Sequence, residues 1–202
     1  MGLARLAALG VVLALAGCVT TAENSLSQND IAGMKLTGVT VGFAPDAQVQ
    51  WEEGIRAYAT AKAITDDQIA TATNTPEGKA YVQNMLAPRI SAEIEKVMAG
   101  QLIGTRPVRL DVTVKTFALS SAVQRILIGG GRGMVADANR VDARTGAIII
   151  ANPDLRAVLF AGQGIVGTAV QAAIDSSSTQ NVVEKLVDRY GESYRDWLLR
   201  RT

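Results

Sequence analysis

VRLDVTVK, at residues 108–115, is the clearest secondary-structure signal in this chain of 202 residues. Valine and leucine alternate there with charged residues and threonine, and a period of two residues places the apolar side chains on one face of a β-strand. We therefore predict a strand over 108–119 with one buried face and one wet face, as in an antiparallel or edge-exposed sheet.

Weaker patterns extend the sheet on both sides of this strand. Residues 35–43 alternate in the same way, and Pro45-Asp46 is expected to end that strand. Downstream, residues 134–141 and 147–150 flank Asp142-Ala143-Arg144-Thr145-Gly146, which predicts a hairpin whose turn uses a positive φ at Gly146. A further extended segment over 155–160 is expected after a break at Asn152-Pro153-Asp154.

Apolar residues at helical spacing predict two helices before residue 101. Residues 47–63 form an amphipathic pattern around Trp51 and Ile55, and Thr65-Asp66-Asp67-Gln68 is expected to open a short helix after it. A second helix with a strong pattern follows Thr75-Pro76, and Gly100 is expected to end it, with a kink or restart at Pro88.

A last long helix closes the chain and completes the fold prediction. Its apolar residues recur from Val182 to Leu198, and Ser176-Ser177-Ser178 is expected to cap its start. One apolar sheet face and two long amphipathic helices favour a two-layer sandwich. We predict the α/β (α+β) class, with a mostly antiparallel sheet of three or four strands and the two helices on one face.

The composition excludes several kinds of chemistry. The chain has no histidine and one cysteine, so Ser-His-Asp or Cys-His catalysis, histidine-ligated zinc and internal disulfides are ruled out. Lys and Arg number 20 against 19 Asp and Glu, a balance that gives no basis for nucleic-acid binding. We expect no metal, no cofactor and no catalytic residue.

The N-terminus carries a targeting signal. Arg5 is followed by an apolar run over 6–17, which is too short to span a bilayer as a helix, since about 20 residues are needed. The run ends Leu15-Ala16-Gly17-Cys18, which resembles the lipobox of bacterial lipoproteins. The resemblance implies cleavage before Cys18, a diacylglyceryl thioether on its sulfur and acylation, as by palmitate, of the new amine. Several acyl chains on one residue make attachment to the membrane effectively permanent.

The lipobox sets the expected domain boundaries and location. We expect residues 1–17 to be a lipoprotein signal peptide, 18–34 to be the lipidated Cys18 and a flexible, polar tether, and 35–202 to be a single periplasmic α/β domain. In the sorting pattern of such lipoproteins, Asp after the cysteine favours retention in the inner membrane. Val19 stands there instead, which indicates the periplasmic face of the outer membrane.

Two glycine-rich segments invite ligand-binding interpretations. Residues 162–167 fit G-x-G-x-x-G, but too little chain follows to build a dinucleotide fold, so a connector or a packing surface is favoured. Residues 162–174 could pack in the core, bind lipid or contact a partner. Residues 129–133 lack the Lys-Ser/Thr ending of a phosphate-binding loop and indicate a bulge or bend.

Three carboxylate pairs suggest hydrolase chemistry only weakly. They are Glu52-Glu53, Asp66-Asp67 and Glu93 with Glu95, and neighbouring acids on a helix point in different directions. Acids near the starts of helices usually stabilise the helix, so no catalytic role is assigned to them.

Taken as a whole, the chain resembles small envelope lipoproteins of Gram-negative bacteria with domains of unknown function. The features that carry the resemblance are the lipobox, the 108–112 strand, the glycine run at 129–133 and the hairpin at 141–146. The resemblance implies a compact α/β domain and an envelope location, and it carries no catalytic residues. The leading hypothesis is a noncatalytic outer-membrane lipoprotein that faces the periplasm, contacts the membrane through acyl chains on Cys18 and serves an envelope protein partner in assembly or transport. A lipoprotein that binds lipid or another apolar ligand is the alternative, and an acid-residue cell-wall hydrolase is the weaker one.

Overall fold

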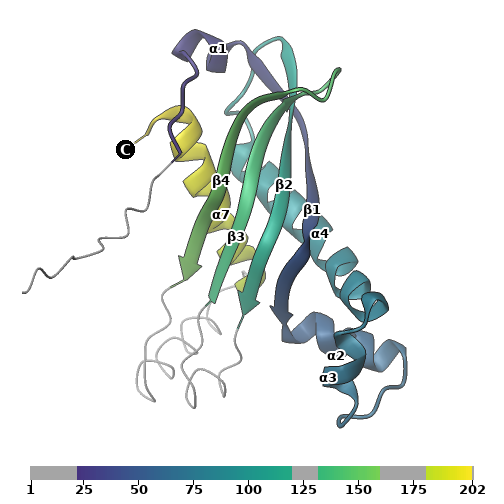
Figure 1. Cartoon of the computed structure of the whole chain (residues 1–202). Helices are drawn as coiled ribbons and strands as arrows, with labels where there is room; N and C mark the ends of the chain where they lie inside the picture. The colour runs from purple at the N-terminus through teal and green to yellow at the C-terminus, as the bar shows by residue number, and fades with distance from the viewer. Residues whose placement is uncertain (1–21, 120–131, 160–180, 202) are drawn as a thin grey trace, which may run out of the picture.

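A four-stranded sheet covered on one face by two long helices makes up the domain (Figure 1). The computed structural model describes residues 22–119, 132–159 and 181–201. The strands are β1 (Met34–Trp51), β2 (Arg106–Leu119), β3 (Arg132–Asp142) and β4 (Ile148–Leu159). The helices are α1 (Gln28–Ala32), α2 (Glu52–Ala61), α3 (Ile69–Thr73), α4 (Pro76–Met98) and α7 (Val182–Leu199).

The strand order is β1-β2-β3-β4, with β1 parallel to β2 and the other neighbours antiparallel. Helix α4 packs on β1 and on α7, and α7 packs on β3 and β4. The predicted fold class is therefore confirmed: a mostly antiparallel sheet of four strands carries two long helices on one face.

The core lies between the sheet and these two helices. The strand prediction for 108–119 is confirmed, because the alternate residues of β2 are buried while their neighbours are only half-buried. Residues from β2, β3, α4 and α7 fill the interior, and each is at most 1% exposed: Val108, Leu110, Val112, Val114, Phe117, Met134, Ala136, Ala138, Leu86, Ile90, Ile94, Met98, Leu186, Val187, Tyr190, Tyr194 and Leu198.

Strand β1 runs further than the sequence indicated. Pro45-Asp46 was expected to end it and a helix to begin at residue 47, but the strand continues to Trp51 and α2 starts at Glu52. The register with β2 shifts between Phe43 and Gln48 and then resumes. Because β1 is an edge strand, Pro45 can interrupt the pairing locally without ending the strand.

Strand β4 likewise absorbs the break predicted at Asn152-Pro153-Asp154. The ladder to β3 shifts register there, Asp154 has a φ of 53°, and pairing continues to Leu159. The segment is thus an irregularity within one strand at the sheet edge. The hairpin before it agrees with the prediction, since Gly146 has a φ of 73°.

Side-chain caps set the starts of α4 and α7. The Thr75 hydroxyl accepts the Gly78 N–H and Pro76 occupies the first turn, while Pro88 is accommodated inside α4. The cap predicted for α7 at residues 176–178 is wrong. Asn181 caps it instead. Its side chain accepts a first-turn N–H, and the Glu184 carboxylate, three residues later in the first turn, accepts the Asn181 N–H, which forms a capping box.

Candidate functional site

Several predicted functional residues lie outside the described residues. They are Cys18, the glycines at 129–131, the G-x-G-x-x-G segment at 162–167 with its continuation to 174, and the serines at 176–178. The lipidation of Cys18 and the three interpretations of residues 162–174 therefore stay predictions.

The described chain starts on the C-terminal end of α7. The indole Nε1–H of Trp197 donates to the Ala22 carbonyl at 2.6 Å, and the Asn24 amide donates to the carbonyls of Trp197 and Leu198 at 3.2 and 2.8 Å. Arg200 donates to the carbonyls of Asn24 and Leu26 at 2.7 and 2.6 Å. Since carbonyls in the last turn of a helix lack helical partners, Asn24 supplies a cap for α7.

Helix α1 continues this attachment. Ser27 and Asp30 form a reciprocal capping box, and hydrogen bonds from the side chain and backbone of Ser27 hold the pKa of Asp30 below its usual value. Ile31 and Met34 are buried in the core. The part of the expected tether that is described, residues 22–34, is therefore held on the domain.

The loop before β2 meets the chain just after α1. The Gly104 N–H donates to the Met34 carbonyl at 2.7 Å, and the N–H groups of Thr105 and Arg106 donate to the Gly33 carbonyl at 3.0 and 2.9 Å. We use "anchoring end" for residues 22–35, 99–106, 142–148 and 197–201, which gather at the end of the sheet where β1, β2 and β4 start and β3 ends (Figure 1).

The sheet face opposite the helices carries ion pairs. Arg109 contacts Asp111 through two hydrogen bonds of 2.6 and 2.9 Å. The Lys115 ammonium lies 2.7 Å from Asp137 and 2.9 Å from Asp154, and hydrogen bonds to those carboxylates raise the pKa of Lys115. We call these five residues the polar face. Such half-exposed pairs contribute little to stability, about 0–1 kcal/mol each, so their arrangement says more about surface chemistry than about folding.

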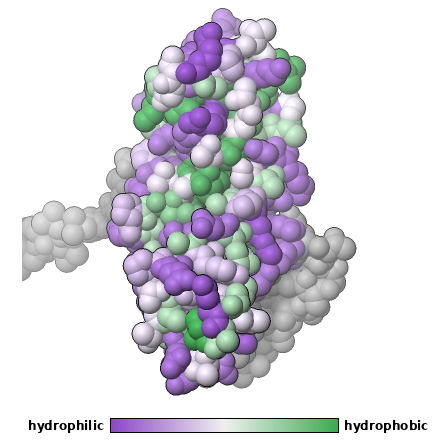
Figure 2. Space-filling model, turned by 90° about the vertical axis from the view of Figure 1, so that its right-hand side faces the viewer, coloured by the Kyte–Doolittle hydropathy of each residue, from purple (hydrophilic) through white to green (hydrophobic). Residues whose placement is uncertain are grey.

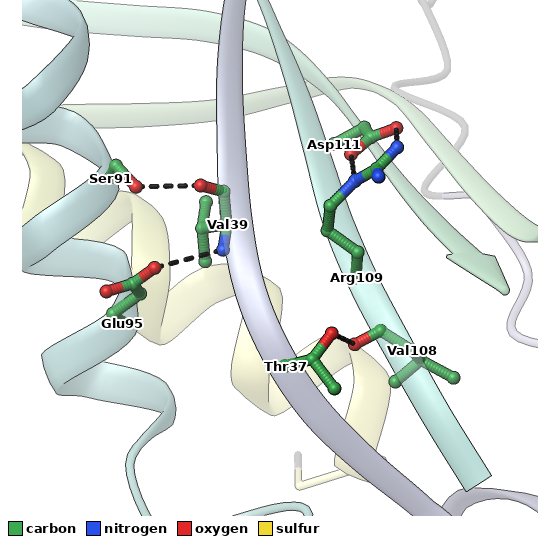
Figure 3. Close-up of polar contacts among 7 residues, drawn as sticks. All are labelled: Thr37, Val39, Ser91, Glu95, Val108, Arg109 and Asp111. Atoms are coloured by element: carbon green, nitrogen blue, oxygen red, sulfur yellow. Dashed lines mark hydrogen bonds and ion pairs between the residues drawn. The ribbon is translucent and has the colours of Figure 1, made fainter. Parts of the chain in front are cut away.

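Side chains of α4 protect the exposed edge of β1 (Figure 3). Glu95 accepts the Val39 N–H at 3.0 Å and Ser91 donates to the Val39 carbonyl at 2.8 Å. Next to them, at a register shift, the Thr37 hydroxyl donates to the Val108 carbonyl at 3.1 Å. Apolar and hydrophilic residues are interspersed on this side of the molecule (Figure 2). With both backbone groups of Val39 bonded to α4, the edge is blocked to an added strand at that residue.

A buried cation lies under α7. The Arg140 side chain is fully buried, and its Nε and Nη2 donate to the Tyr194 hydroxyl at 3.2 and 2.8 Å. Within the described chain its Nη1 has no acceptor. Burial raises the pKa of Tyr194, and the Arg140 cation opposes part of that rise. Sequence reasoning missed Arg140, although its place in the alternation with Met134, Ala136 and Ala138 was a signal that it faces the helices.

The carboxylate pairs noted in the sequence separate in the structure. Glu52 pairs with Arg56 and Glu53 with Arg89, while Glu93 pairs with Lys96. Glu95 is the acceptor at the β1 edge, and Asp66 and Asp67 are exposed. Over residues 22–119, 132–159 and 181–201, no three potential metal ligands come together.

None of the helices described is both long and apolar enough to cross a membrane.

No protein-family model and no curated protein matches the chain. Among solved structures, it is similar to a Caulobacter crescentus CB15 protein provisionally classed as a lipoprotein, with 16% identity, a TM-score of 0.35 and coverage of 56% of this chain and 80% of that one. It is also similar to a PelC dodecamer, a point variant of the Paraburkholderia phytofirmans protein, with 11% identity, a TM-score of 0.32 and coverage of 84% and 95%. The lipoprotein GNA1162 of Neisseria meningitidis gives 18% identity, a TM-score of 0.26 and coverage of 74% and 99%.

Proposed function

We propose that this protein is a lipoprotein anchored through Cys18 in the outer membrane, with its α/β domain facing the periplasm. The observation that carries the proposal is the sequence Leu15-Ala16-Gly17-Cys18 at the end of a short apolar run, with the sole cysteine of the chain in the position that a lipobox requires. Val19 after the cysteine supports the outer membrane as the destination.

Within the envelope, the domain acts as a noncatalytic module that binds a protein partner in assembly or transport. The polar face supports this role, because it presents cations and carboxylates side by side on the sheet. Complementary charge on a partner would orient binding there, since charged groups contribute chiefly to specificity and association rate.

The anchor is tested by expressing the wild type and Cys18→Ser in a Gram-negative host, followed by intact mass measurement and membrane fractionation. We expect acyl mass and sedimentation with the outer membrane for the wild type only. Wild type without acyl mass, or equal fractionation of the two proteins, contradicts the anchor.

The interaction role is tested by photo-crosslinking in the same host. A crosslinking residue at Thr113, between Asp111 and Lys115 on the polar face, should give one discrete adduct. The control is the same residue at exposed Thr60 on α2, where no such adduct is expected. Equal labelling at both positions, or at neither, argues against a partner on this face.

A further inference from the structure

We propose that the anchoring end rests directly on the phospholipid surface, so that the domain stands on the membrane with a fixed end down. The inference rests on the proposed acylation of Cys18 and goes beyond it, because an acylated protein could equally hold its domain away from the lipid on a long, flexible linker. Three observations argue for contact.

The first observation is how little chain separates the anchor from the domain. Four residue steps lead from Cys18 to Ala22, and an extended chain covers at most about 3.6 Å per residue, so the Cα atoms of these two residues lie within about 14 Å of each other. From Ala22 onward the chain is bound to Trp197, Leu198 and Arg200. The domain therefore has little freedom to turn another end toward the membrane.

The second observation is where large apolar side chains are exposed. Ile103 is 83% exposed in the loop before β2, and Ile148 is 62% exposed at the start of β4. Both belong to the anchoring end, as the bridge from Ile103 to Lys35 and the pairing of Ile148 with Val141 show. Exposed aliphatic side chains at the level of lipid headgroups bury apolar surface in the acyl boundary. Val158, the other large apolar residue that is exposed in the described part of the chain, at 51%, lies at the opposite end of the sheet.

The third observation is the charge of the same end. The cationic residues outnumber the carboxylates there: Lys35, Arg106, Arg144, Arg200 and Arg201 against Glu23, Asp30 and Asp142. Asp142 pairs with Arg106, and with that pair set aside four cations remain against Glu23 and Asp30. Clustered cations are attracted to an anionic lipid surface.

The partial negative charge at the C-terminus of α7 would oppose this contact if it were bare. It is not bare, because the Asn24 amide covers the carbonyls of Trp197 and Leu198, and Arg200 lies beside them. The geometry thus presents a cationic surface with two apolar anchors within reach of the lipid.

The test uses the full acylated protein in vesicles of phosphatidylethanolamine and phosphatidylglycerol. Ile103→Cys, Ile148→Cys and the control Val158→Cys are made one at a time and labelled with a thiol-specific nitroxide. An acylated Cys18 is a thioether and does not react, so each protein carries a single label. Intact mass is measured before labelling.

For each label we measure the ratio of its collision rate with oxygen, which is soluble in lipid, to its collision rate with a water-soluble nickel chelate. We expect this ratio to be several-fold higher for the labels at 103 and 148 than for the label at 158. Arg144→Glu combined with Arg201→Glu should reduce that difference at 148. Acyl mass with equal nickel accessibility at all three positions overturns the docking but leaves the anchor standing. Absence of acyl mass, together with nitroxide on Cys18, overturns the anchor and the docking with it.

Discussion

Replacing Tyr194 by Phe should destabilise the domain strongly, although it removes a single oxygen atom. That oxygen accepts both the Nε and Nη2 donors of Arg140, at 3.2 and 2.8 Å, and no carboxylate in the described chain pairs with this fully buried guanidinium. The substitution leaves the cation in the core without the acceptor that now stabilises it.

The magnitude follows from the cost of an uncompensated buried charge. A hydrogen bond to a charged group contributes about 1.5–3 kcal/mol, and removing one partner of a buried charged pair costs about 3–5 kcal/mol. The Phe ring keeps the ring contact with Arg140, whose guanidinium carbon lies 5.5 Å from the centroid. We therefore expect Tyr194→Phe to lower the free energy of unfolding by about 2–4 kcal/mol.

The matched variants are Arg140→Met and the double variant. Arg140→Met removes the cation and leaves the hydroxyl of Tyr194 without its donors, which costs about 1–3 kcal/mol against the gain from burying an apolar chain. Combining it with Tyr194→Phe removes both polar groups, so the double variant should be more stable than Tyr194→Phe alone. This non-additivity is the signature of a direct interaction.

Urea unfolding followed by circular dichroism measures all four proteins, with the denaturant slope checked for constancy. A Tyr194→Phe variant whose free energy of unfolding lies within about 0.5 kcal/mol of the wild-type value would refute the reasoning, because substitutions at ordinary surface positions have effects of that size. So would a double variant less stable than Tyr194→Phe, since it would mean that the guanidinium stabilises the core through some other contact.

Three further changes test the hairpin, the loop before β2 and the β1 edge. Hydrogen bonds from the N–H groups of its own turn, and to a smaller extent from Arg106, hold the pKa of Asp142 below its unfolded value of 3.8. The carboxylate therefore stabilises the fold above pH 3.8, and this contribution is lost as the pH falls through the lower pKa of the folded state. In acid titrations of stability, Asp142→Asn should be less stable than the wild type at neutral pH and less sensitive to acid. Gly104→Ala places a Cβ 2.2 Å from the Gly33 carbonyl carbon, which must move, and thermal unfolding should reveal a loss of about 1–3 kcal/mol; an unchanged melting temperature would contradict this packing. Glu95→Ala removes the acceptor of the Val39 N–H, so it should lower the free energy of unfolding by about 1 kcal/mol and increase self-association in sedimentation experiments. Glu95→Gln keeps an acceptor and should stay close to the wild type in both measurements.

The sequence alone determined the features that depend on local periodicity and turn chemistry. The alternation at 108–115 specified β2 and its buried face, the Thr75-Pro76 start placed α4, and Gly146 specified the hairpin. Each signal lies within a few residues of the structure that it predicts, so no information from the rest of the chain was needed. The proposed anchor is of the same kind, because the lipobox at 15–18 is a local pattern.

The tertiary structure decided where those local signals compete with long-range pairing. Pro45 and Pro153 predict strand ends, yet β1 and β4 continue past them because hydrogen bonds to β2 and β3 resume beyond each irregularity.

The same reason explains what the sequence could not show at the anchoring end. Residues 22–27 are mostly polar and were expected to be flexible, but Asn24 is held by α7, more than 170 positions away in the chain. Arg140 is buried because Tyr194 reaches it from a helix 54 positions later. Partners separated by that much chain meet only once the sheet and helices have packed, and that packing turns a polar segment into part of the domain.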